Sequence, residues 1–153
     1  LEELGTTQFL IDLNVDDDLS SILDEASWLE KLGNIRSIAM SNLNAACIVM
    51  PGLTFNDAYR SVEEPYGKSN IRPDDKKEVR KETCIAIRCV QMLALFTSLA
   101  VPWLLVSPQS HQSLFGLADL PDSEEICRGR RRVRILSDGR HVDAVMSHDC
   151  AAP

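Results

Sequence analysis

The densest cluster of one side-chain type in this 153-residue sequence is a run of arginines, formed by Arg128, Arg130, Arg131, Arg132 and Arg134. Guanidinium groups bind phosphate oxygens through paired hydrogen bonds, and clusters of them bind nucleic-acid backbones in a salt-dependent way. Because the whole chain has a formal net charge of −7, this run is the segment expected to attract phosphates. We predict that it contacts the backbone of DNA or RNA. The alternative, a solvated and charged edge strand that prevents sheet aggregation, stays open.

Two groups of residues near the end of the sequence have the side-chain types of catalytic or metal sites. Ser147-His148-Asp149 contains the residue types of a catalytic triad, but adjacent residues cannot arrange themselves as nucleophile, base and orienting group. We interpret them as solvated tail residues. Cys127, His141, His148 and Cys150 offer four zinc ligands, yet their spacing lacks the close cysteine pairs of zinc knuckles. We therefore expect neither a catalytic residue nor a metal site here.

The composition, with 44% hydrophobic and 25% charged residues, is that of an ordinary globular domain. The seven glycines are scattered and form no phosphate-cradling motif, so no site for ATP or a dinucleotide is expected. Five cysteines are an odd number at irregular spacings, and Cys47, Cys84 and Cys89 lie within apolar segments. This pattern favours reduced core thiols over a disulfide framework. We expect an intracellular protein, cytoplasmic or nuclear.

One apolar stretch, residues 89–106, is long enough to raise the question of a membrane span. It is interrupted by polar residues and by Pro102, and it follows a heavily charged segment, which favours a buried helix followed by a buried strand. We therefore expect no membrane partner. The sequence begins at Leu1 and ends at Pro153 without the signals of a domain terminus, so we expect a piece of a longer polypeptide whose flanking domains are its partners.

The elements that would position these residues follow from hydrophobic periodicity and from turn signals. Short apolar runs predict buried strands at residues 9–13, 45–50 and 103–106, the last two ending at Pro51-Gly52 and Ser107-Pro108. Helical spacing predicts one helix over residues 19–32, ended by Gly33, and a second from Pro73 to about Leu99. Residues 51–72 lack a period, and residues 110–119 are expected to be a loop or a short helix. Ser137-Asp138-Gly139-Arg140 predicts a hairpin of residues 132–136 and 141–145.

Strands that alternate with long helices predict an α/β fold with a Rossmann-like parallel sheet, helices on its faces and a C-terminal β-hairpin. We treat residues 1–153 as one domain or fragment, with a β-α-β-α-β unit at 9–126 and a basic hairpin and tail at 127–150. Ligands of such sheets bind beyond the carboxyl ends of the strands. Here those ends are residues 14–18, 51–55 and 107–110.

The loops at these strand ends carry short motifs in a recognisable order along residues 9–150. They are Ile11-Asp12-Leu13, Pro51-Gly52-Leu53-Thr54-Phe55, Val101-Pro102-Trp103 through Ser107-Pro108, Leu114-Phe115-Gly116-Leu117 to Leu120-Pro121, and Cys127-Arg128-Gly129 with the basic residues after it. In this order the chain resembles the cytosine-5 DNA methyltransferase-like segment of some protist retroelement polyproteins. Pro51, Thr54, Phe55 and Pro108 match the family's Pro-Pro-Cys-x-Thr-Phe-Ser and Glu-Asn-Pro motifs.

The resemblance implies a partial class I methyltransferase fold, DNA as substrate and S-adenosylmethionine as cofactor. In that family the loop cysteine attacks the pyrimidine ring while the Glu of Glu-Asn-Pro contacts a ring nitrogen. In this sequence Gly52 takes the place of the nucleophile, Val106 that of the Glu and Ser107 that of the Asn. The glycine motif that binds the cofactor would lie upstream of Leu1. Cys47 cannot replace the nucleophile because it lies inside an apolar strand.

Three hypotheses follow from this combination. The one that we favour is a non-catalytic methyltransferase-like module of a mobile-element polyprotein, without a cofactor, that binds nucleic acid if it has a function. The rival is an active S-adenosylmethionine-dependent DNA cytosine methyltransferase that upstream sequence or a partner chain completes. The third is a decaying reading frame without a selected function. The absence of the nucleophile, the acid and the cofactor loop are three independent losses, and they favour the first.

Overall fold

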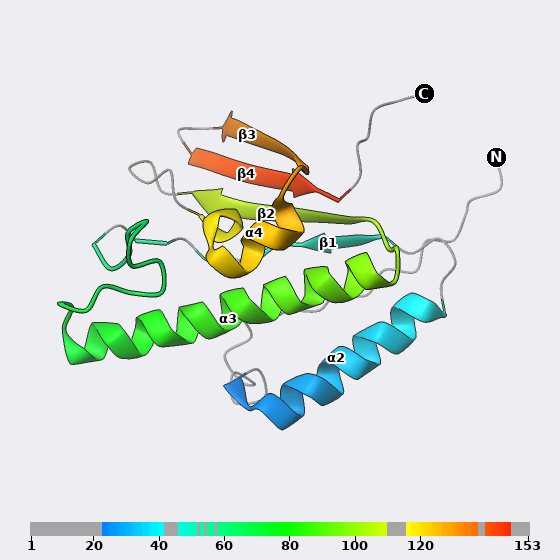
Figure 1. Cartoon of the computed structure of the whole chain (residues 1–153), viewed down its shortest axis with the longest axis horizontal. Helices are drawn as coiled ribbons and strands as arrows, with labels where there is room; N and C mark the ends of the chain where they lie inside the picture. The colour runs from blue at the N-terminus through cyan, green and yellow to red at the C-terminus, as the bar shows by residue number, and fades with distance from the viewer. Residues whose placement is uncertain are drawn as a thin grey trace.

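The computed structural model describes residues 23–41, residues 46–109 except 52, 54 and 57, and residues 116–137 and 140–147. The elements in chain order are α2 (Glu25–Met40), β1 (Cys47–Val49), α3 (Pro73–Ser98), β2 (Trp103–Gln109), the 3-10 helix η2 (Leu117–Asp119), α4 (Pro121–Cys127), β3 (Arg131–Ser137) and β4 (Arg140–Met146) (Figure 1). The strand predicted at residues 9–13 lies outside the described residues. The mixed α/β class is confirmed.

Helix α2 begins and ends later than the sequence pattern predicted. The Asp24 side chain caps the helix by accepting a 2.9 Å hydrogen bond from the backbone N–H of Ser27. Gly33, predicted to end the helix, lies in its interior, because the helix continues to Met40 and buries Ile35 beyond the glycine. A glycine lowers helix stability but does not end a helix whose following turn packs against the core.

Helix α3 has the predicted bounds. It begins at Pro73, with Asp74 and Asp75 in its first turn, where a proline and acidic side chains favour a helix start. One face is buried along its length, through residues such as Val79, Ala86 and Leu93. After its last turn the chain passes through Ala100 in a left-handed conformation, with φ of 55°, and enters β2.

The sheet is mixed and has the strand order β1-β2-β4-β3 in the described part of the chain. Strands β1 and β2 are parallel, with Val49 opposite Leu105, and α3 is the crossover between them. Strand β4 is antiparallel to both β2 and β3. It follows that β1, β2 and β3 run in one direction and β4 runs against them. The prediction of a parallel sheet is therefore correct for one pair of strands only.

The hairpin is confirmed and belongs to the main sheet, because β4 pairs with β2 over six residues as well as with β3. This pairing also corrects the predicted end of the third strand. Ser107 and Pro108 do not close β2; they continue it, opposite Asp143 and Val142. Pro108 lacks a backbone donor, but the strand still pairs through its neighbours. The segment predicted as a loop or short helix holds η2, and α4 follows it.

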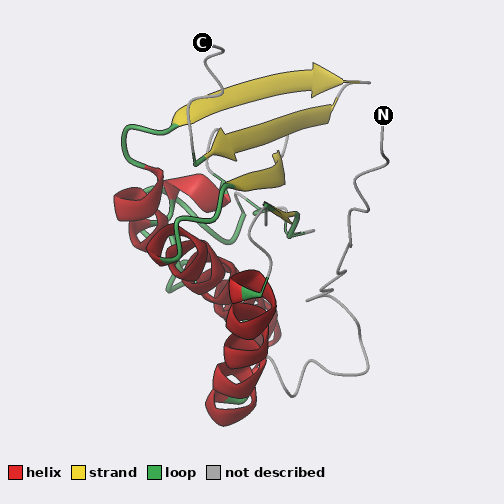
Figure 2. Ribbon diagram, turned by 90° about the vertical axis from the view of Figure 1, so that its right-hand side faces the viewer, coloured by secondary structure: helices red, strands yellow, loops and turns green. Residues whose placement is uncertain are grey.

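The core lies between the described helices and one face of the sheet. Val49, Trp103, Leu105 and Val145 point into it from three strands, and they pack in one cluster with residues of α2, α3 and η2. Figure 2 shows the helices gathered on one side of the strands. The described helices thus cover one face of the sheet, whereas the sequence predicted helices on both faces.

Candidate nucleic-acid interface

The arginine run begins in the turn after α4 and continues along β3, which lies at one edge of the sheet. Gly129 makes the turn with φ of 70°, a left-handed conformation that favours glycine. Along β3, successive side chains point to opposite faces. Arg132 and Arg134 therefore point to the face that the helices cover, and Arg131 points to the other face.

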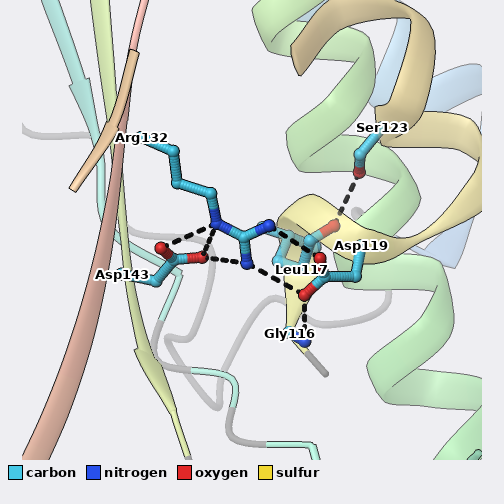
Figure 3. Close-up of polar contacts among 6 residues, drawn as sticks. All are labelled: Gly116, Leu117, Asp119, Ser123, Arg132 and Asp143. Atoms are coloured by element: carbon cyan, nitrogen blue, oxygen red, sulfur yellow. Dashed lines mark hydrogen bonds and ion pairs between the residues drawn. The ribbon is translucent and has the colours of Figure 1, made fainter. Parts of the chain in front are cut away.

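Arg132 lies between two carboxylates (Figure 3). Its Nε donates to both carboxylate oxygens of Asp143, at 2.9 and 2.8 Å, and its two terminal nitrogens donate to the oxygens of Asp119 at 2.7 and 2.9 Å. The Asp143 side chain is 0% exposed. Asp119 also accepts a 2.8 Å hydrogen bond from the backbone N–H of Gly116. One guanidinium group thus joins β3, β4 and the turn that contains η2.

The electrostatics of this cluster follow from the same contacts. Burial alone would raise the pKa of Asp119, but the hydrogen bonds from Arg132 and from the Gly116 N–H outweigh it and lower that pKa. The two carboxylates raise the pKa of Arg132. Because both of its partners are anionic and one is fully buried, the charge of Arg132 is compensated inside the protein. Its role in the fold is to neutralise a buried acid.

Arg130 also makes contacts within the protein. Its Nε donates to the Ile126 carbonyl at 3.1 Å, a terminal nitrogen donates to the Ser147 carbonyl, and the guanidinium lies 5.6 Å from the centre of the Trp103 ring. Ser147 is buried, and its hydroxyl accepts a 2.7 Å hydrogen bond from the Trp103 N–H. The interpretation of Ser147 as a solvated tail residue is therefore wrong. His148 and Asp149 lie outside the described residues.

Three arginines of the run are left with exposed positions and little internal bonding. Arg128 makes one ion pair with Glu124 at 2.9 Å, and both side chains are exposed, so the pair adds little to stability. The side chains of Arg131 and Arg134 are exposed and form no hydrogen bond or ion pair with the described residues. The candidate phosphate ligands of the run are thus Arg128, Arg131 and Arg134.

A shallow hollow of about 200 Å³ lies between α4 and the hairpin. Arg128, Arg130 and Arg132 line it together with Glu124 and Cys127. The Cys127 thiol cannot serve there as a ready nucleophile, because burial raises its pKa more than the nearby arginines lower it. The hollow brings Arg128, Arg130 and Arg132 to one surface, but Arg130 and Arg132 are hydrogen-bonded within the protein.

The described positions that match the methyltransferase motifs lie at or near the carboxyl ends of β1 and β2. Pro51 and Phe55 are buried after β1, whereas Gly52 and Thr54 lie outside the described residues. Near the end of β2, Val106 is half-buried on the face of the sheet that points away from the core, and Ser107 is buried on the core face opposite Asp143. Neither of these two side chains carries a carboxylate that could assist chemistry on a base.

Burial disfavours thiol chemistry at Cys47, the first residue of β1, and at Cys89 in the middle of α3. Cys47 on β1 is opposite Trp103, and burial raises its pKa to about 11. Burial likewise raises the pKa of Cys89 to about 12. Both thiols are protonated at neutral pH, so neither is an activated nucleophile. This agrees with the sequence interpretation of Cys47 as a core residue.

Arg60 is a residue that the sequence analysis missed. It is 2% exposed, and it donates to the Pro65 carbonyl at 2.9 Å, to the Val79 carbonyl at 3.0 Å and to the Thr83 hydroxyl at 3.0 Å. Its guanidinium also lies 4.4 Å from the centre of the Phe55 ring. Burial lowers its pKa, although Glu82 acts in the opposite direction. A single arginine in an aperiodic segment gives no sequence signal for such a role.

Two further expectations from the sequence concern a metal site and a membrane span, and the described residues test each of them only in part. Among them, no group of three or more His, Cys, Asp or Glu side chains is placed to hold a metal ion. Of the four zinc candidates, His148 and Cys150 lie outside the described residues, as does the side chain of His141. No helix in the described part of the chain has the length and apolarity to cross a membrane.

No protein-family model, no curated protein and no solved structure matches the chain significantly. The resemblance to cytosine-5 DNA methyltransferases therefore stays a prediction from the strand-end motifs.

Proposed function

We propose that this chain is a non-catalytic methyltransferase-like module of a mobile-element polyprotein that contacts the backbone of a nucleic acid through Arg128, Arg131 and Arg134. The observation that carries the proposal is the exposure of these three arginines around one edge strand. Arg131 and Arg134 have no carboxylate partner at ion-pair distance among the described residues, and the one partner of Arg128, Glu124, is itself exposed, so all three guanidinium groups can reach phosphates. The contacts are backbone contacts, so the binding is weak and indifferent to base sequence.

The proposed fold is a Rossmann-like sheet of the class I methyltransferase type. Three strands running in one direction and a helical crossover between β1 and β2 support it. Mixed sheets are common among α/β folds, although β4 lies inside this sheet and not at its edge. The parallel pair also brings the ends of β1 and β2 to the same edge, where such folds bind their ligands.

The absence of catalysis is proposed from the residues at that edge. The loop after β1 has Gly52 where a nucleophile would stand, and the thiol nearest to it in sequence, Cys47, has a raised pKa. Val106 and Ser107 point to opposite faces of β2 and provide no acid. The rival is a methyltransferase that upstream sequence or a partner chain completes. It needs both the nucleophile and the acid from outside the described residues.

The test is fluorescence anisotropy of a labelled DNA duplex at several salt concentrations. We expect weak binding by the unmodified chain, and the triple variant Arg128→Ala, Arg131→Ala, Arg134→Ala should lower the salt slope by up to about 2.7, because each phosphate contact contributes about 0.9. The matched control removes three exposed cations from the helices instead, in Arg36→Ala, Lys77→Ala, Arg80→Ala. Equal effects of the two triple variants would show that net charge alone governs binding, and the proposal would fail.

A further inference from the structure

The hollow between α4 and the hairpin contains one arginine whose charge no carboxylate compensates. Its charged lining consists of Arg128, Arg130, Arg132 and Glu124. Arg132 lies between two carboxylates, and Arg128 is paired with Glu124. Arg130 is different, because both of its hydrogen-bond acceptors are neutral backbone carbonyls. In the described part of the chain, no carboxylate forms an ion pair with Arg130.

Arg130 is also half-buried and held in one orientation. Its bonds to the Ile126 and Ser147 carbonyls and its position beside the Trp103 ring fix the guanidinium group through three contacts. A guanidinium group has five N–H donors, and the two hydrogen bonds use two of them. The other three have no acceptor among the described residues. An anion in the hollow would bond these donors and compensate the half-buried charge, and it would find the side chain already ordered.

The kind of anion follows from the size of the hollow and from the arginine at its rim. Its volume of about 200 Å³ is several times the roughly 30 Å³ of one water molecule in the liquid, so a phosphate group fits. Arg128 is exposed, and its ion pair with Glu124 is weak because both side chains are in solvent. Arg128 can therefore leave Glu124 and bind the same anion as Arg130. A phosphate dianion has the oxygens and the charge for two guanidinium groups.

We propose that the hollow binds one phosphate group, with Arg130 as its central ligand and Arg128 as a second ligand from the rim. The group is a dianion, which both free phosphate and the terminal phosphate of a nucleic acid provide. Arg128 is shared with the proposed nucleic-acid contact, whereas Arg130 takes no part in it. The site therefore stands even if the chain does not bind a nucleic-acid backbone.

Cys127 lines the same hollow and provides the readout. Burial raises the pKa of its thiol, and the charges of Arg132 and Arg130 oppose that rise. A bound phosphate would cover the thiol and compensate Arg130, and both effects slow alkylation of Cys127. The full chain is treated with iodoacetamide at mildly alkaline pH, and mass spectrometry of its peptides follows the reaction. Cys84, half-buried on α3 and away from the hollow, is the internal reference.

Inorganic phosphate should slow the alkylation of Cys127 severalfold and saturably, and it should leave Cys84 unchanged. Acetate at the same ionic strength should have no effect. A short oligonucleotide with a 5′-phosphate, and the same oligonucleotide without it, distinguish the two sources of the group. Protection by the phosphorylated form at concentrations where inorganic phosphate gives none assigns the site to a nucleic-acid end. Protection by inorganic phosphate at the same or a lower concentration assigns it to free phosphate.

Two neighbouring glutamates of α4 provide a matched pair of variants. Both are exposed, but Glu124 lines the hollow and Glu125 does not. Glu124→Gln releases Arg128, so the phosphate concentration for half protection should fall about threefold, the effect of one exposed ion pair. Glu125→Gln should leave it unchanged. Arg130→Ala should abolish protection, with circular dichroism as the folding control. The glutamate variants give the answer where Arg130→Ala does not fold.

Three results would overturn the inference. The first is alkylation of Cys127 that phosphate does not slow, or that acetate slows equally. The second is an equal effect of Glu124→Gln and Glu125→Gln, or full protection in a folded Arg130→Ala. The third is equal protection by the two oligonucleotides with none by inorganic phosphate, because the ligand would then be the backbone. A failure of duplex binding, in contrast, would refute the nucleic-acid proposal alone.

Discussion

Arg132 on β3 is bonded to Asp143 on β4, although the residue directly opposite Asp143 in the strand register is Arg134. The ion pair is therefore diagonal, and it leaves the guanidinium of Arg132 in reach of Asp119 as well. Two adjacent arginines on the same face of one strand thus have different roles. Arg132 compensates a buried carboxylate, and Arg134 remains exposed.

This difference predicts different costs of mutation. Arg132→Ala should lower the free energy of unfolding by about 3 kcal/mol, because it leaves the fully buried Asp143 carboxylate without its cation. Arg134→Ala is the matched control and should change that free energy by less than about 0.5 kcal/mol, as for most exposed residues. Urea denaturation followed by circular dichroism gives both values. Similar losses in the two variants would mean that the diagonal pair does not stabilise the hairpin.

The lowered pKa of Asp119 predicts a loss of stability in acid. A carboxyl group whose pKa is lower in the folded state stabilises the protein above its unfolded pKa, close to 3.8, and this contribution disappears as the pH falls through the folded value. The free energy of unfolding should therefore decrease below about pH 4. In Asp119→Asn this decrease should be smaller. Urea titrations at a series of pH values measure it, and identical profiles for the two proteins would contradict the prediction.

The proposed lack of catalysis predicts that the chain does not bind S-adenosylmethionine. The sequence has no glycine-rich turn between a strand and a helix to receive the cofactor. Isothermal titration calorimetry with the full chain should give a flat trace. Saturable heat at micromolar cofactor would favour the rival enzyme.

The same proposal predicts no covalent complex with DNA that contains a fluorinated cytosine, a mechanism-based trap for the cysteine nucleophile. Gly52 has no side chain that could attack the ring. Gly52→Cys should also fail to form the adduct, because Val106 still lacks a carboxylate. Denaturing gel electrophoresis detects such complexes, and a resistant band from the unmodified chain would refute the proposal.

The parts of the fold that could be predicted from the sequence are those with local signals. Pro73 with its two following aspartates marks the start of α3, and Asp138-Gly139 marks the hairpin. The position of β4 between β2 and β3 has no local signal, because it depends on pairing with a strand that ends some thirty residues earlier in the chain. Gly33 misled the prediction since the packing of Ile35 outweighs the weak helix propensity of glycine.

The candidate site was predictable to a similar extent. The run of arginines is visible in the sequence, but the sequence does not show which of them are bonded within the protein. The partners of Arg132 are 11 and 13 residues away, in β4 and η2, and only the folded chain brings them together. Charge density therefore indicated five candidate cations, of which Arg130 and Arg132 are bonded within the protein.

Arg60 changes how the long connection between Val49 and Pro73 contributes to stability. Its hydrogen bonds to the Val79 carbonyl and Thr83 hydroxyl fasten the middle of this connection to α3. In terms of chain entropy, the connection behaves as two short loops closed in turn, each with a smaller closure cost than one long loop. An insertion on one side of Arg60 would lengthen only one of these loops and leave the closure cost of the other unchanged.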